Sequence, residues 1–140
     1  MKVRFRNQNG AAIVEFAVLL PLLILFVFGI IEFGTLLYDQ QILTNASREG
    51  ARAGIVQQNP RVDPASIDNV VQTYCSNYLI TFGNTNSPIT TLTGYNSNAV
   101  FGQDLKVTVT YNYQFLVIPN FVPGLNSLRT MMAETLMRYE

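Results

Sequence analysis

The hydrophobic and polar positions divide the chain into a long apolar stretch and a mixed remainder. From Ala11 to Ile31 the residues are uncharged except for Glu15, and most of them are large and apolar. A helix rises about 1.5 Å per residue, so this stretch would be about 30 Å long, the thickness of a hydrocarbon core. The pattern therefore predicts a membrane-spanning helix over residues 11–32, with a kink at Pro21.

The helical pattern continues past the span, and one helix is expected from about Ala11 to Val56. Its outer third is rich in small residues between Ala46 and Gly54, which predicts the close approach of another backbone. That backbone belongs either to the chain's own sheet or to another subunit. The apolar stripe of this outer part is offset from Asp39, Gln40, Arg48, Glu49 and Arg52, and it comprises Phe33, Leu36, Leu37, Leu43, Ala46 and Ala53.

Two prolines end this helix, and a second, shorter helix follows. Pro60 and Pro64 break the pattern, and Asp63 can cap a helix that runs from Pro64 to about Leu79. Asp63 and Asp68 are interpreted as cap and surface residues, because a calcium site needs several convergent oxygens. The buried face of this helix is predicted to contain Ile67, Val70, Val71, Tyr74 and Tyr78.

The last part of the chain has the alternation of β-strands. Apolar and polar residues alternate from Leu105 to Val117, which predicts a half-buried strand, and the polar run 81–104 before it is read as loop or irregular edge strand. Pro119, Pro123 and Gly124 interrupt the pattern. The closing run favours a strand paired with residues 105–117, with a short C-terminal helix as the alternative, because one face could hold Met131, Ala133, Thr135, Met137 and Tyr139.

Together these elements predict an α+β fold in which a long N-terminal helix carries a small head with an antiparallel sheet. The head has about 75 residues after Pro64, so it depends on the first helix for part of its core. The expected divisions are a leader over 1–10, a membrane span over 11–32, an exported continuation of the helix over 33–56 and the head over 57–140.

Composition excludes several classes of function. The 140 residues include nine basic and nine acidic side chains, no His, no Trp and one Cys, and no basic stripe of the kind that binds nucleic acid. A single Cys75 without any His leaves no zinc site or cysteine protease, and Cys75 is expected to pack in the head. No catalytic set and no cofactor are expected. Lys2, Arg4 and Arg6 before the span predict a cytoplasmic N-terminus and an exported head.

Glu15 is the unusual residue of the span. An acidic side chain at the centre of a membrane helix costs about 2.5–3.5 kcal/mol, and less near an end. Glu15 is therefore either a boundary residue that reaches toward the headgroups or the partner of a positive charge. No basic residue occurs between Arg6 and Arg48, so that partner lies outside the span. A cut after Gly10 would create an α-amine at Ala11, which could pair with Glu15 of a neighbouring helix.

The sequence "NGAAIVEF" resembles the processing site of type IV prepilins, on the match of Gly10, Ala11, Glu15 and Phe16. In that superfamily a membrane prepilin peptidase removes the basic leader after the Gly and can methylate the new N-terminus. The resemblance implies that Gly10 and Ala11 form the processing site and that Glu15 and Phe16 act in assembly.

A longer stretch resembles the TadE-like family of tight-adherence (Tad) pilus assembly. The matching features are the early "EF", "LLP" within the span, "EFG" at its outer end and "ASREGARAG", which includes Arg48, Glu49, Gly50 and Arg52. The resemblance implies a minor pilin or pseudopilin at the bacterial inner membrane. Its expected partners are the lipid bilayer, a prepilin peptidase, other pilin-like subunits and the Tad assembly platform, and nucleic acid is not among them.

A second hypothesis from a different class remains open. The chain could be a membrane-anchored binding module that is not processed and whose exported head recognises a surface ligand through its Asn-, Thr- and Tyr-rich loop. The two hypotheses differ at Gly10 and Glu15, since the pilin hypothesis needs both residues and the binding module needs neither.

Overall fold

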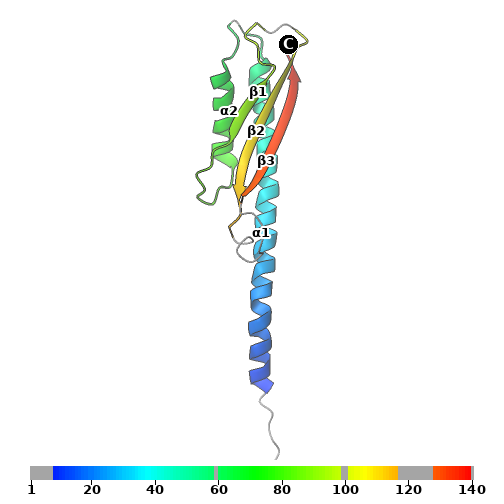
Figure 1. Ribbon diagram of the computed structural model, residues 1–140, viewed down its shortest axis with the longest axis vertical. Helices are drawn as coiled ribbons and strands as arrows, with labels where there is room; N and C mark the ends of the chain where they lie inside the picture. The colour runs from blue at the N-terminus through cyan, green and yellow to red at the C-terminus, as the bar shows by residue number, and fades with distance from the viewer. Residues whose placement is uncertain (1–7, 59, 99–100, 117–127, 140) are drawn as a thin grey trace, which may run out of the picture.

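The computed structural model describes residues 8–58, 60–98, 101–116 and 128–139. Within these ranges the chain forms a long shaft with a small head packed against its outer part (Figure 1). The expected α+β class is confirmed. The elements in chain order are α1 (Gln8–Ile55), α2 (Pro64–Tyr78), β1 (Ile89–Thr93), β2 (Asp104–Gln114) and β3 (Leu128–Arg138).

Helix α1 contains 48 residues, which corresponds to a length of about 70 Å. It continues through Pro21, and Figure 1 shows it as one unbroken rod from its N-terminal part to the top of the head, without the kink expected at Pro21. The expectation of one continuous helix that runs from the apolar stretch into the head is therefore confirmed.

The sheet has three antiparallel strands in the order β1-β2-β3. At its centre Val109 of β2 lies opposite Thr90 of β1 and Ala133 of β3. The closing run of the chain is thus the predicted strand rather than the alternative helix, and β1 is the edge strand expected within the polar run. The inner face of the sheet contains Leu105, Val107, Val109, Tyr111 and Tyr113 from β2 with Met131 and Ala133 from β3.

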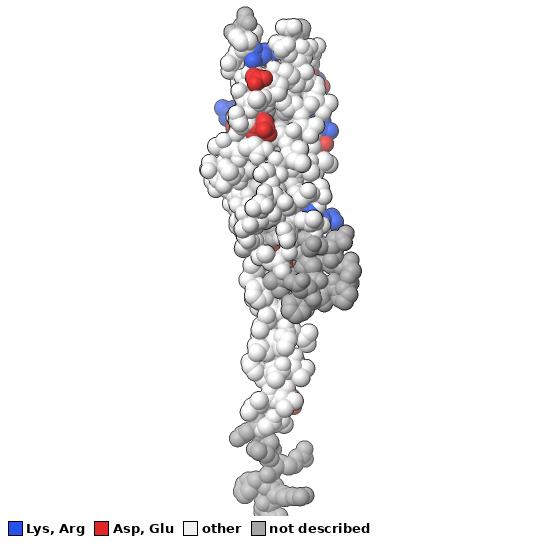
Figure 2. Space-filling view, turned by 60° about the vertical axis from the view of Figure 1, so that its left-hand side comes forward, with Lys and Arg blue, Asp and Glu red and all other residues white. Residues whose placement is uncertain are grey.

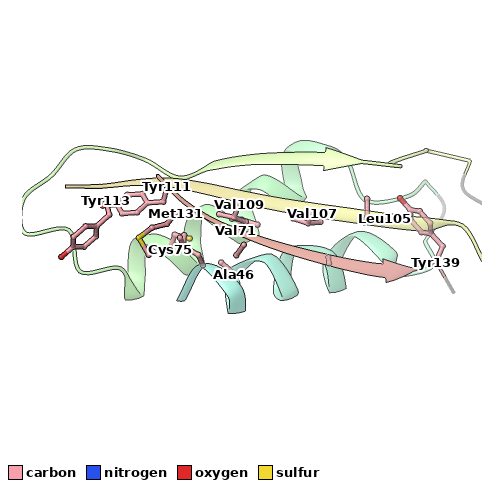
Figure 3. Packing of buried hydrophobic residues seen from close by; sticks show 13 residues of the cluster. Ala46, Val71, Cys75, Leu105, Val107, Val109, Tyr111, Tyr113, Met131 and Tyr139 are labelled. Carbon is pink, nitrogen blue, oxygen red and sulfur yellow. The ribbon is translucent and has the colours of Figure 1, made fainter. Parts of the chain in front are cut away.

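The core lies between the inner face of the sheet and the two helices (Figure 3). Helix α1 contributes Leu43, Ala46 and Ala51, and helix α2 contributes Val71 and Cys75. The head therefore has no complete core without α1, as its small size predicted. Tyr139 closes the core at the far end of β2, and Arg61 lies over its ring with 4.5 Å between the guanidinium carbon and the ring centroid.

The small residues of α1 allow the head to approach the helix closely. A Cβ atom on Gly50 would lie 2.6 Å from Val71 Cγ2 of α2, and one on Gly54 would lie 2.4 Å from Leu105 Cδ2 of β2. Both distances are shorter than van der Waals contact. The sequence left open whether the small residues meet the chain's own sheet or another subunit. In the structure they meet the chain's own sheet and second helix.

Some of the predicted faces are wrong in detail. The sequence pattern predicts Asp39 on the polar side of α1, but its side chain is fully buried and accepts a hydrogen bond from the head. The same pattern predicts Phe33 and Leu37 on the apolar stripe, yet they are 59% and 54% exposed.

On α2 the prediction of Ile67 and Val71 as buried is confirmed, whereas Val70 and Tyr78 are exposed and Cys75 takes the third buried position. Ile67, Val71 and Cys75 are four residues apart, so they lie on the side of α2 that faces the core, and the opposite side faces solvent. Several interpreted positions lie outside the described residues, namely Lys2, Arg4, Arg6, Val117, Pro119, Pro123 and Gly124.

Candidate functional site

The candidate site is the exposed shaft of α1 below the head. Nearly all side chains from Ala11 to Ile31 lie on the surface, on every side of the helix. On the face of the molecule seen in Figure 2, the charged side chains gather on the head, above an almost uncharged shaft. A helix that is apolar on all sides belongs in a membrane or among other apolar helices. By length and composition α1 is able to cross a membrane.

The predicted processing and assembly residues lie together at the start of the shaft. Gly10 and Ala11 are in the first turns of α1, and both are exposed. Glu15 and Phe16 follow about one turn later, and Phe16 is 61% exposed. The next basic residue along the described helix is Arg48, about 50 Å farther along its axis. The shaft itself therefore offers Glu15 no cation.

The residues of the second motif lie at the opposite end of α1 and have two different environments. Arg48, Glu49 and Arg52 are exposed, whereas Gly50 is buried beneath Val71. Gly50 thus serves the packing of α2 on α1, and the charged residues remain available at the surface. The structure does not bring this motif near Glu15.

Glu49 also lines an open hollow of about 460 Å³ beside α2. The rings of Tyr74 and Tyr78 lie there with their centroids 4.8 Å apart. The remaining lining residues are Asn69, Val70, Thr73 and Asn77. This hollow is a candidate recognition surface, and it differs from the Asn-, Thr- and Tyr-rich loop of the binding-module hypothesis.

Two buried carboxylates that the sequence reasoning did not single out attach the head to the shaft. Asp39 Oδ1 accepts a hydrogen bond from the backbone N–H of Ile80 at 3.0 Å. Glu32, only 5% exposed, accepts one from the backbone N–H of Leu116. Next to it, the hydroxyl groups of Tyr113 and Thr35 are 2.8 Å apart and share a hydrogen bond.

Burial of Asp39 affects its own pKa and that of the nearby Cys75. Burial raises the pKa of the Asp39 carboxyl, and the hydrogen bond from Ile80 opposes that rise. Burial, with a smaller contribution from the nearby charge of Asp39, raises the pKa of the Cys75 thiol to about 11. The thiol is therefore protonated and buried at neutral pH, which agrees with the packing role predicted for it.

A signal for these carboxylates was present in the sequence. Glu32 and Asp39 are seven residues apart, and Ala46 follows after another seven, so all three lie on one face of a helix. Two acidic residues in line with a small core residue indicate a face that meets polar groups of another segment. Charge alone, without this alignment, had placed Asp39 on the solvent side.

No metal site is indicated among the residues that the structure describes. Within residues 8–58, 60–98, 101–116 and 128–139 no group of three or more acidic or cysteine side chains is close enough to hold an ion. Asp63 precedes α2, and its backbone carbonyl accepts from the N–H of Ser66 at 2.9 Å. Asp68 accepts from the side chain of Gln72 at 3.2 Å. Asp63 is thus the N-cap residue of α2, but its side chain makes no capping hydrogen bond, and Asp68 is half-buried beside Gln72.

The architecture defines a class of small α+β proteins in which one apolar N-terminal helix anchors and partly fills a compact head. Comparison with protein families adds a more particular finding, since the family model of TadE-like proteins matches residues 10–52. The resemblance to the TadE-like family is thereby confirmed over most of α1, from the predicted scissile bond to Arg52. Comparison with curated proteins and with solved structures gave no significant match.

Proposed function

We propose that this chain is a minor pilin or pseudopilin of a Tad pilus assembly system, which is processed after Gly10 and assembles through its N-terminal helix. The observation that carries the proposal is a shaft that is apolar on all sides and holds one carboxylate, Glu15, within the segment that resembles TadE-like proteins. A helix of this kind needs apolar surroundings, and its carboxylate needs a cation.

Processing would supply that cation. Cleavage between Gly10 and Ala11 creates an α-amino group at the start of the helix and makes Glu15 the fifth residue of the mature chain. Within one straight helix the amine and the carboxylate lie on successive turns, and two helices packed side by side can pair the amine of one with the carboxylate of the other. Assembly then neutralises a charge that is costly in the membrane.

The proposal also includes an orientation and a set of partners. Lys2, Arg4 and Arg6 would hold the leader in the cytoplasm, so that the span over 11–32 crosses the inner membrane and the head is exported. A prepilin peptidase would act on the leader from the membrane. Other pilin-like subunits and the Tad assembly platform would receive the mature helix.

The test is the mass of the mature protein in cells that contain an active prepilin peptidase. The expected chain begins at Ala11 and has lost three basic residues, so its formal net charge changes from zero to about −3. Gly10→Leu should block processing, because a branched side chain would fill the position next to the scissile bond. Gly29→Leu is the matched control, since a side chain at Gly29 meets no other atom of the chain within 4 Å.

Full-length protein that retains residues 1–10 in such cells would exclude the processed pilin. It would favour the unprocessed membrane-anchored binding module, for which the hollow beside Glu49, Tyr74 and Tyr78 is the recognition surface to examine first.

A further inference from the structure

The base of the head forms an apolar surface around α1. A hollow of about 100 Å³ is lined by Phe28, Ile31 and Glu32 of α1 together with Phe82 and Leu116 of the head. Phe82 lies between α2 and β1, and Leu116 follows β2, so two segments distant in sequence meet the helix here. Phe82 and Leu116 are 49% and 48% exposed. The head therefore directs two large apolar side chains toward the shaft while leaving half of each uncovered.

Phe82 adopts a backbone conformation that a bulky residue rarely takes. Its φ is +46°, and the next residue, Gly83, has a φ of +84°. The left-handed region costs a residue with a side chain about 1–2 kcal/mol. The turn is closed by the hydrogen bond from the backbone N–H of Asn84 to the carbonyl of Thr81 at 2.8 Å, and it holds the half-exposed Phe82 against the shaft.

The depth of these residues along α1 identifies those surroundings. The uncharged stretch of α1 ends at Ile31, and Phe28 lies three residues, or about 4.5 Å, inside it. Phe82 and Leu116 line the same hollow as Phe28 and Ile31. If α1 spans the bilayer, both side chains reach the zone between the acyl chains and the headgroups, which is several ångströms thick on each side.

The charges around this surface are compatible with lipid. No Asp, Glu, Lys or Arg occurs from Asn69 to Gln103, the stretch that contains the Phe82 turn. Among the described residues that line the hollow, Glu32 is the only charged one, and it is almost completely buried and accepts a hydrogen bond from the backbone N–H of Leu116. The head thus covers the one carboxylate that would otherwise face the outer edge of the membrane.

From this geometry we infer that the head rests on the bilayer, with Phe82 and Leu116 inserted into its outer interfacial zone beside α1. The lipid would occupy the hollow next to Phe28 and Ile31. Phe82 and Leu116 line the same hollow as Phe28 and Ile31 of the uncharged stretch, so a single apolar environment can cover all four side chains. The inference depends on the membrane span alone and not on processing or assembly.

The absence of tryptophan from the chain makes a direct test possible. The full-length protein is reconstituted at low density in phosphatidylcholine vesicles whose acyl chains carry bromine, and one tryptophan is introduced at a time. The brominated lipid should quench most of the tryptophan fluorescence of Phe82→Trp, and the remaining emission should lie at shorter wavelength than that of tryptophan in water. Leu116→Trp reports independently from the other segment, should Phe82→Trp disturb the turn.

Two further variants set the scale of the measurement. Leu22→Trp, within the span, should be quenched fully, and Phe101→Trp, at a position 81% exposed on another turn of the head, should not be quenched. Emission at both Phe82→Trp and Leu116→Trp that matches Phe101→Trp and is quenched by aqueous acrylamide would overturn the inference. Emission shielded from both lipid bromine and acrylamide would overturn it as well, because a protein partner would then cover the surface.

Discussion

Glu32 and Asp39 lie seven residues apart on α1, and each carboxylate accepts a hydrogen bond from a backbone N–H of the head. Seven residues make about two helical turns, so both side chains project from one face of the shaft. The donors are Leu116, which follows β2, and Ile80, which follows α2. The two ends of the head nearest the apolar stretch of α1 are thus attached to the helix by acceptors that the helix itself provides.

The first prediction concerns Asp39 and the pH dependence of stability. Burial raises the pKa of its carboxyl above the ordinary value of 3.8, so the folded protein holds this proton more tightly than the unfolded chain. The stability contributed by Asp39 is therefore complete below its ordinary pKa and is lost as the pH rises through the raised value. Asp39→Asn cannot ionise, and it should flatten the fall in unfolding free energy between acidic and neutral pH.

Denaturant titrations of the detergent-solubilised protein from about pH 4 to about pH 8 would measure this profile. Asp39→Ala serves as the comparison. Asp39→Ala should also flatten the profile. At every pH it should be less stable than Asp39→Asn by about 1–3 kcal/mol, because the buried N–H of Ile80 loses its acceptor. An Asp39→Asn profile as steep as that of the unmodified protein would contradict the raised pKa.

The second prediction uses the close approach at Gly54. A Cβ there would lie 2.4 Å from Leu105 Cδ2 and 2.9 Å from Ile67 Cδ1, so Gly54→Ala should force two core side chains to move, at a cost of about 1–3 kcal/mol. The gain in helix propensity, about 1 kcal/mol, offsets only part of that cost. Gly34→Ala makes the same change where nothing lies within 4 Å, and it should be neutral or stabilising. In parallel thermal unfolding, Gly54→Ala should lower the midpoint and Gly34→Ala should leave it unchanged or raise it. Equal shifts for the two variants would mean that α1 and the head do not pack this closely.

The third prediction tests the two faces of β2. Val109 is fully buried between Thr90 and Ala133, so Val109→Asp would bury an unpaired charge and should cost several kcal/mol, enough to unfold a marginal domain. Asn112→Asp is the matched control on the outer face, because Asn112 is exposed and its Oδ1 accepts from Thr130, a role that a carboxylate keeps. Near-ultraviolet circular dichroism during thermal unfolding distinguishes them. Equal midpoints would show that the assignment of faces is wrong.

Thr108→Asp should have a cost in stability between those of Val109→Asp and Asn112→Asp. Thr108 also faces outward, but it lies directly opposite Glu134, and a second carboxylate at that position would repel the first. The ion pair between Lys106 and Glu134 at 2.8 Å should limit the cost to less than about 1 kcal/mol.

The fourth prediction concerns Glu15. Because Glu15→Val replaces a costly charge in the span, membrane insertion should be unchanged or improved, and cleavage after Gly10 should largely persist. Assembly with other pilin-like subunits should fall. Glu15→Gln should have the same effect despite its similar shape, because charge is the property that is missing.

Crosslinking between subunits through a single cysteine at Ala12, in a Cys75→Ser background, would measure assembly. Crosslinking yields for Glu15→Val as high as those for Glu15 would show that the carboxylate is only a boundary residue. That outcome would favour the membrane-anchored binding module over the pilin.

The sequence by itself determined the elements whose pattern is local and repeated. The apolar stretch from Ala11 to Ile31, with Glu15 as its one charge, and the alternation from Leu105 to Tyr113 predicted the shaft and the inner face of β2, and the structure confirms both. The period-two face from Met131 to Tyr139 predicted β3 in the same way. Each of these patterns extends over many residues in one environment, so its periodicity reports the environment directly.

Only the tertiary structure decided which side of the outer helix meets the head. Asp39 turns inward because the N–H of Ile80, forty-one residues away, needs an acceptor, and Gly54 is required because Leu105 approaches it from the sheet. Phe82 reaches the edge of the span because α2 ends where it does and the chain turns back there. These relationships join residues far apart in the chain, and the free energy of burying a charge or a ring depends on partners that a local pattern does not contain.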